Sequence, residues 1–151
     1  MSACVAFLHF LAAFALFAAL AVELMLTRGT LDAVTARRLL VVDGVFGISA
    51  TVVLLAGIAR VLWFAKGPAY YLHDIYFIAK MALFAAIGLL SIYPTLQFLR
   101  MRPVLRQGGT PALHPAHQRR VRLVIHVEAT LVVLMILCAS LMARGVGVIG
   151  G

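Results

Sequence analysis

The sequence predicts an all-α integral membrane protein, built as a bundle of four transmembrane helices. Of its 151 residues, 64% are hydrophobic and only 12% are charged. The mean hydropathy is +1.08, far from the balance of a soluble domain. Four apolar runs are each long enough to cross the hydrocarbon layer, which takes about 20 helical residues. Because lipid offers no partner for backbone polar groups, each run is expected to be helical.

The four spans are expected at residues 4–26, 39–63, 75–99 and 122–143, within a single transmembrane domain covering residues 1–151. The first run lacks a positively charged start and a convincing small-residue cleavage site. It is therefore expected to be a retained span and not a signal peptide.

Two features are expected to interrupt helical structure. The connection 101–120 contains three prolines and a Gly-Gly pair, which predict a non-helical loop. Within the third span, Pro94 predicts a kink, with the hydroxyl group of Ser91 available to compensate for the freed carbonyl group of Leu90.

The distribution of positive charge predicts the orientation. Arginines concentrate in the first and third connections and their flanks: Arg28, Arg37, Arg38, Arg100, Arg102, Arg106, Arg119, Arg120 and Arg122. The positive-inside rule places both connections in the cytoplasm and both termini outside. Membrane insertion thus explains the net charge of +8. The expected partner is the lipid bilayer, and no nucleic acid is expected.

Ionisable side chains inside the spans predict two polar layers. Such groups cost roughly 2.5 to 3.5 kcal/mol each to insert, so they mark pairing or function. By depth, the inner layer contains Glu23, Asp43 and Glu128 beside the arginine-rich connections. Structural ion pairs with arginines such as Arg38 and Arg122 are expected there.

The outer layer contains His9 and Lys80, with Arg60 and His73 near the interface. A neutral imidazole is a good axial ligand for haem iron, so His9 is the candidate metal ligand. An ammonium group at the depth of Lys80 needs an anion, which a haem propionate or the carboxylate of Asp74 could supply. His73 is a conceivable second iron ligand, although five-coordinate iron on His9 alone is simpler.

Several stretches resemble one family. RRLLVVDGVFGIS, GIARVLWFAKGPAYYLHDIYFIAKMALF, GLLSIYPTLQFLR and LMARGVG are similar to bacterial four-span membrane proteins grouped as domain of unknown function 2214. A more distant likeness is to the haem-b-binding protoporphyrinogen oxidase of bacterial membranes, whose early histidine and lysine map onto His9 and Lys80. That family has a Trp-containing motif where this chain has AALAVELMLTR. The likeness implies a tetrapyrrole site at these two residues.

Three functions follow from these observations. The first is a haem b or porphyrin protein acting in redox or tetrapyrrole chemistry, with His9 as ligand, Lys80 and Arg60 as propionate partners, and electrons supplied by quinone or a partner membrane protein. The second is a non-enzymatic subunit or assembly factor of a larger membrane complex. The third is a proton or small-solute path using Lys80 and Glu128. The sequence assigns no catalytic residue.

Overall fold

The structure is a computed structural model that describes residues 2–64, 74–111 and 113–144. Within these residues, four long helices follow one another: α1 (Ser2–Leu26), α2 (Ala33–Ala59), α4 (Ile75–Arg106) and α5 (Pro115–Ala143). A short π-helix, η1 (Arg60–Phe64), continues α2. All four long helices are long and apolar enough to cross a membrane, which confirms the predicted all-α fold.

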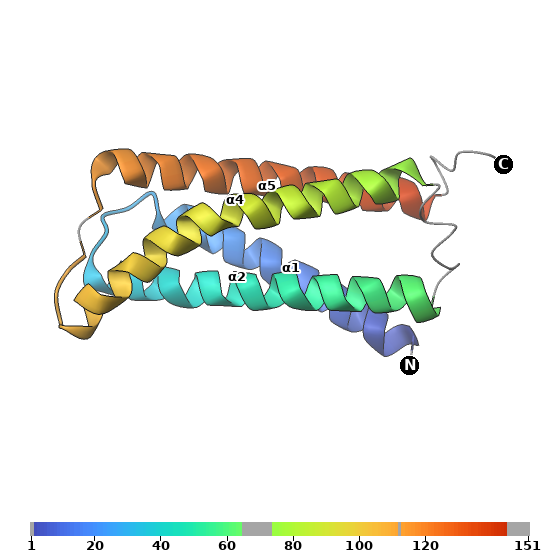
Figure 1. The fold of residues 1–151 in the computed structure, drawn as a ribbon, viewed down its shortest axis with the longest axis horizontal. Coiled ribbons are helices and arrows are strands. Elements are labelled where there is room, and N and C mark those ends of the chain that lie inside the picture. The colour runs from blue at the N-terminus through green and yellow to red at the C-terminus, as the bar shows by residue number, and fades with distance from the viewer. Residues whose placement is uncertain (1, 65–73, 112, 145–151) are drawn as a thin grey trace.

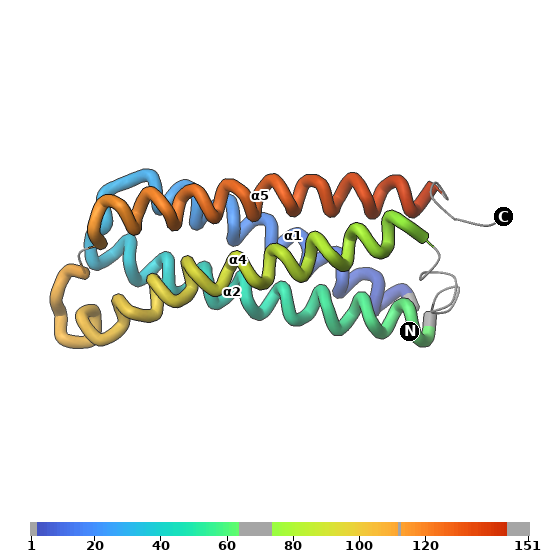
Figure 2. The backbone as a smooth tube through the Cα atoms, turned by 45° about the horizontal axis from the view of Figure 1, so that its top comes forward, coloured from blue at the N-terminus to red at the C-terminus, as the bar shows by residue number. Residues whose placement is uncertain are grey.

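The helices run up and down and form a ring of four. Helix α1 packs against α2, and α4 packs against α5, while contacts of α1 with α5 and of α2 with α4 close the ring. The start of α1, the end of α5 and the start of α4 lie at one end of the bundle (Figures 1 and 2). Both arginine-rich connections lie at the other end, so the chain has its positive charge concentrated there, as the alternation of spans predicts.

Helix α2 begins earlier than the apolar run alone indicates. Asp32 is its N-cap, and Asp32 Oδ1 accepts a hydrogen bond of 2.7 Å from the backbone N–H of Thr35. This cap satisfies a donor that the first turn of a helix leaves free. Hydrogen bonding by the Thr35 side chain, and then by its backbone N–H, lowers the pKa of Asp32 below its usual value.

The prediction of a non-helical loop over residues 101–120 is wrong in extent, because most of these residues are helical. Helix α4 continues through Pro103, and the chain turns where Gly108 adopts φ +75°, a conformation that glycine adopts without steric cost. Helix α5 then starts at Pro115, where the missing N–H of proline costs nothing. The side chain of His114 caps α5 by accepting from the backbone N–H two residues on, at 3.3 Å.

Helix α4 changes neighbours along its length. Its first half runs beside α5, and its second half slants across the bundle towards α2 (Figure 1). Pro94 lies buried within this helix. Ser91 Oγ donates to the carbonyl oxygen of Gly88 at 2.9 Å and not to the carbonyl group that Pro94 frees.

The core and the outer surface are both apolar, as expected for a protein that contacts lipid. Leu20 and Phe98, each 1% exposed, belong to the buried cluster at the centre of the bundle. Phe14 is 77% exposed, and Leu89 is 70% exposed. An exterior this apolar is the kind of surface that a bilayer solvates.

Candidate ligand site between the helix pairs

His9 is buried on the inward face of α1 and is held by the backbone of α2. Its ring is 8% exposed, and its Nδ1 lies 3.0 Å from the carbonyl oxygen of Val53. A carbonyl oxygen can only accept, so Nδ1 carries the hydrogen atom in this bond. The lone pair therefore remains on Nε2. In metal-binding histidines, too, one ring nitrogen binds the metal while the other donates a hydrogen bond to a carbonyl or carboxylate oxygen.

Gly57 allows this close approach of α1 to α2. An ideal Cβ atom at Gly57 would lie 3.4 Å from Cε1 and 3.8 Å from Nδ1 of His9. A methyl group would therefore contact the imidazole ring directly, and a larger side chain would occupy its place. The position of His9 depends on a small residue one helical turn beyond Val53.

Arg60 is placed by the π-helix and by an aromatic neighbour. It is the first residue of η1, and π-helical turns inside or at the end of α-helices are frequent at functional sites. Its Cζ atom lies 5.6 Å from the ring centroid of Phe10, within the range of a cation–π interaction. The Phe10 ring also meets His9 edge to face, with centroids 6.0 Å apart.

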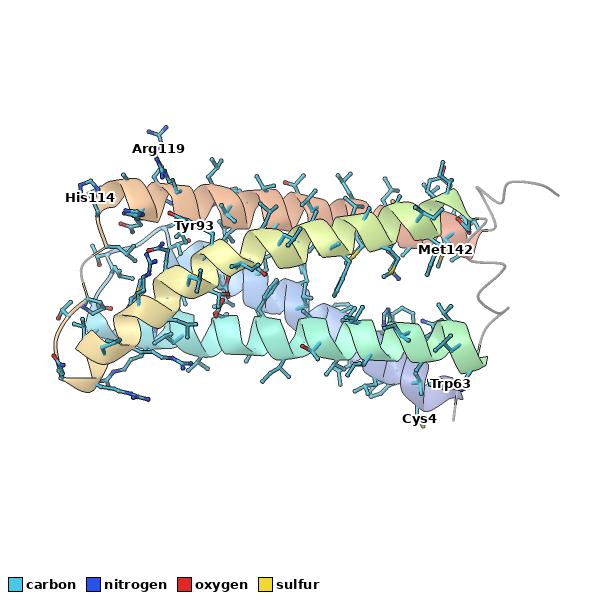
Figure 3. The ribbon with its side chains drawn as sticks, in the orientation of Figure 1. Cys4, Trp63, Tyr93, His114, Arg119 and Met142 are labelled. Carbon is cyan, nitrogen blue, oxygen red and sulfur yellow. The ribbon has the colours of Figure 1, made fainter. Side chains whose placement is uncertain are left out.

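His9, Arg60 and Lys80 line one cavity of about 200 Å³ between the two helix pairs. Both cations act electrostatically on the His9 ring, so α1, η1 and α4 each bring one polar group to the same place. The remaining lining is mainly apolar and includes Met81 and Met142. Figure 3 shows Met142 at the same end of the bundle as Cys4 and Trp63. His73 was the fourth residue expected here, and it lies outside the described residues.

A second cavity of about 200 Å³ adjoins the first. The two share Leu54 and Phe84 in their linings, and the second extends between α2 and α4 as far as Thr95. Together they form an elongated space with His9 and the two cations at one end and the hydroxyl groups of Thr51, Ser91 and Thr95 along the other. A single cavity of this size is below the range of about 300 to 1,000 Å³ for small-molecule sites, and the pair reaches that range.

The carboxylate of Asp74 is engaged by α4 itself. Its Oδ1 accepts from the backbone N–H groups of Tyr76 and Phe77, at 2.9 and 3.3 Å, and Asp74 is the N-cap of the helix. This contact satisfies the helix N-terminus. Oδ2 of the same carboxylate is buried without a hydrogen-bond partner among the described residues, so the anion that Lys80 requires can come from Asp74 or from a ligand in the cavity that Lys80 lines.

The inner layer brings three carboxyl groups together from three helices. Glu23, Asp43 and Glu128 are all buried, and Glu23 is affected electrostatically by both other residues. Asp43 Oδ1 accepts a hydrogen bond of 2.6 Å from Thr95 Oγ1. Among the described residues, Glu23 Oε1, Glu128 Oε1 and Arg122 Nε have no hydrogen-bond partner. The expected ion pairs of Arg38 and Arg122 with these carboxylates stay a prediction.

The two polar layers differ in what they could hold. Among the described residues, no group of three or more His, Cys, Asp or Glu side chains could bind a metal ion. The carboxyl cluster is thus no multidentate metal site. The outer cavity differs because a porphyrin supplies four of the iron ligands itself, so one histidine suffices there.

Comparison with protein families identifies the chain. The family described as "Predicted membrane protein (DUF2214)" matches residues 1–147, and the chain belongs to this family. The predicted resemblance is confirmed. No match was found among the curated proteins or among the solved structures. The likeness to the haem-b-binding oxidase therefore has no support from these comparisons.

Proposed function

We propose that this member of the DUF2214 family binds haem or another carboxylated porphyrin between its two helix pairs. The observation that carries the proposal is the convergence of His9, Arg60 and Lys80 on one cavity. The imidazole and the two cations come from separate elements, and His9 and Lys80 are expensive to hold inside a bilayer without a function. One ligand that combines a metal centre with two carboxylates accounts for all three.

The hydrogen bond of His9 supports its role as the iron ligand. Because Nδ1 donates to the Val53 carbonyl group, the imidazole presents Nε2 and is fixed in orientation by α2. Met81 and Met142 in the same lining offer a thioether on the opposite helix pair, and His–Met ligation occurs in haem proteins. Arg60 and Lys80 are the residues that would hold the propionates. When bound, haem would supply one-electron redox chemistry.

The lining of the site supports a largely apolar ligand that carries anionic groups at one end. The adjoining cavities meet at Leu54 and Phe84 and continue between α2 and α4. Helices α1 and α2 pack as one pair and α4 and α5 as another, so a macrocycle would enter between the pairs. Electrons would pass to or from the iron through membrane quinone or a partner membrane protein.

The charge distribution supports a location and an orientation for this site. Both arginine-rich connections lie at the end of the bundle opposite the start of α1 (Figure 1). The His9 cavity lies towards that start, because His9 and Arg60 line it. We place the arginine-rich end in the cytoplasm of a bacterium by the positive-inside rule. The porphyrin site would then lie in the outer half of the inner membrane, with both termini outside.

A titration with haem tests the proposal. Protein purified in mild detergent without a histidine tag is titrated with ferric haem, and the Soret band is followed. The wild type is expected to give a saturable band, and His9→Ala is expected to lose it. Arg60→Met and Lys80→Met are each expected to weaken binding roughly tenfold or more, the loss of one charge-assisted hydrogen bond.

His126 supplies the matched control. It is a histidine on α5 in the inner half, exposed, and its Nδ1 lies 2.9 Å from a backbone carbonyl oxygen, that of Arg122. His126→Ala therefore removes an equivalent side chain and hydrogen bond outside the cavity, and it should leave the titration unchanged. Equal titration curves for His9→Ala, His126→Ala and wild type would refute the proposal.

A further inference from the structure

The arginine-rich end of the bundle contains a second polar cavity, unrelated to the His9 site. Arg37, Arg102 and Arg106 line a space of about 430 Å³ together with Leu40 and Leu105. The arginines come from α2 and α4, which are in contact. All three arginines are exposed, so their guanidinium groups are accessible from outside the bundle.

The spacing of these residues explains the convergence. Arg37 and Leu40 are three residues apart on α2, while Leu105 and Arg106 follow Arg102 by three and four residues on α4. Residues at these spacings share one helical face. Two helical faces of the same composition therefore meet across the cavity. Membrane orientation requires arginines in these connections but does not require them to face one another.

The cavity has an excess of positive charge. Among the described residues, no aspartate or glutamate lines it. Asp43 on α2 interacts electrostatically with Arg102, but its carboxylate already accepts the short hydrogen bond from Thr95. Three guanidinium groups around one space repel one another, and an anion bound between them would replace this repulsion with attraction.

We propose that this cavity binds a phosphate group, carried by the headgroup of an anionic phospholipid or by a soluble phosphate compound. Guanidinium groups match phosphate oxygens in paired hydrogen bonds. Basic pockets between transmembrane helices at the cytoplasmic side bind such headgroups. The leucine side chains give the cavity an apolar wall beside its charges, which suits the glycerol and acyl part of a lipid.

Two triple variants test this site with equal loss of charge. Arg37→Gln/Arg102→Gln/Arg106→Gln removes the cavity arginines. Arg28→Gln/Arg119→Gln/Arg120→Gln removes three exposed arginines from the same end of the bundle. Figure 3 shows Arg119 pointing outwards from α5. The measured quantity is the apparent dissociation constant, obtained from the rise in melting temperature in detergent.

Phosphatidylglycerol and pyrophosphate are titrated separately, with phosphatidylcholine as the neutral lipid. At least one anionic probe is expected to bind the wild type and the control variant with the same apparent dissociation constant. For the cavity variant this constant is expected to rise about tenfold or more. Binding of phosphatidylglycerol alone would identify a lipid headgroup, and binding of pyrophosphate would identify a soluble phosphate compound. Equal weakening in both triple variants, or binding of neither anionic probe, would overturn the proposal.

A charge-preserving variant covers the case in which the glutamine triple does not fold. Arg37→Lys/Arg102→Lys/Arg106→Lys keeps three positive charges but loses the paired hydrogen bonds of guanidinium. Its helical content by circular dichroism should equal that of the wild type. Weaker binding of the anionic probe by this variant supports the site, and wild-type affinity contradicts it.

Discussion

Enlarging Gly57 should displace His9 while leaving every polar group of the site in the sequence. An ideal Cβ atom at this position would lie 3.4 Å from Cε1 of the imidazole, which is ordinary van der Waals contact. Gly57→Ala should therefore fit, whereas the further carbon atoms of Gly57→Leu would occupy the space of the ring. The leucine variant should break the hydrogen bond between His9 and Val53.

The expected cost follows from these contacts. Overpacking a well-packed site costs about 1 to 3 kcal/mol, and hydrogen bonds between transmembrane helices contribute about 0.6 kcal/mol on average. Gly57→Leu should therefore lower the free energy of unfolding by about 1.6 to 3.6 kcal/mol. Haem binding should weaken in parallel, since Nε2 moves with the ring.

Gly44 provides the comparison, because it lies on the same helix and an ideal Cβ there meets no atom within 4 Å. Alanine at either position brings the same gain in helix propensity, so the two alanine variants should have similar stability. Unfolding is followed by circular dichroism in mixed micelles of mild detergent and sodium dodecyl sulfate. If Gly57→Leu unfolds with the same free energy as Gly44→Leu and still binds haem, the packing account is wrong.

Three further variants test the cap, the link between α2 and α4, and the core. Asp32→Ala should destabilise α2 at neutral pH. Because hydrogen bonding lowers the pKa of Asp32, the difference in unfolding free energy between the wild type and Asp32→Asn should shrink as the pH falls through that lowered pKa. A difference that does not change with pH would contradict the assignment. Thr95→Val removes the donor to Asp43 and should cost about 0.6 to 1.7 kcal/mol of unfolding free energy, whereas Thr95→Ser, which keeps the hydroxyl group, should cost less. Phe98→Ala should cost about 3 to 5 kcal/mol, since this side chain is 1% exposed, and a cost as small as that of lipid-facing Phe14→Ala would show that the centre of the bundle is loosely packed.

Hydropathy predicted the number and approximate position of the helices because lipid imposes both length and helicity on a spanning segment. Their ends could not be predicted in the same way. Helix α4 continues past its apolar run to Arg106, and α5 starts at Pro115. These ends are set by local backbone chemistry, namely the positive φ of Gly108 and the cap from His114. Hydropathy marks the part of each helix that lies in the bilayer, and the helices continue past that part.

The sequence predicted those features of the candidate site that depend on how deep each residue lies in the membrane. Counting residues from the span ends placed His9 and Lys80 in one layer, and both line one cavity. Which residues touch within a layer depends on the rotation of each helix, which depth does not reveal. The approach of Gly57 and the contact of Arg60 with Phe10 were therefore missed. A glycine and a phenylalanine in an apolar run carry no signal that distinguishes them from ordinary packing residues.

Rotation also decides the arrangement of the inner layer. Depth placed three carboxylates beside the arginine-rich connections and suggested ion pairs. The structure brings Glu23, Asp43 and Glu128 together across three helices, with Thr95 as the donor to one of them. Meanwhile Arg102 lines a cavity of its own with other arginines. Depth alone does not distinguish these two groupings, because both lie at the same end of the bundle.

The most direct test of the central claim is chemical rescue of the iron ligand. His9→Gly removes the imidazole ring and leaves its space within the cavity, so free imidazole can enter and ligate the iron. In the presence of haem, added imidazole should restore the wild-type Soret band of His9→Gly in a saturable manner, and it should not do so for Gly57→Leu, whose side chain occupies that space. If His9→Gly binds haem as the wild type does without imidazole, or shows no saturable response to it, His9 is not the ligand and the proposed site is wrong.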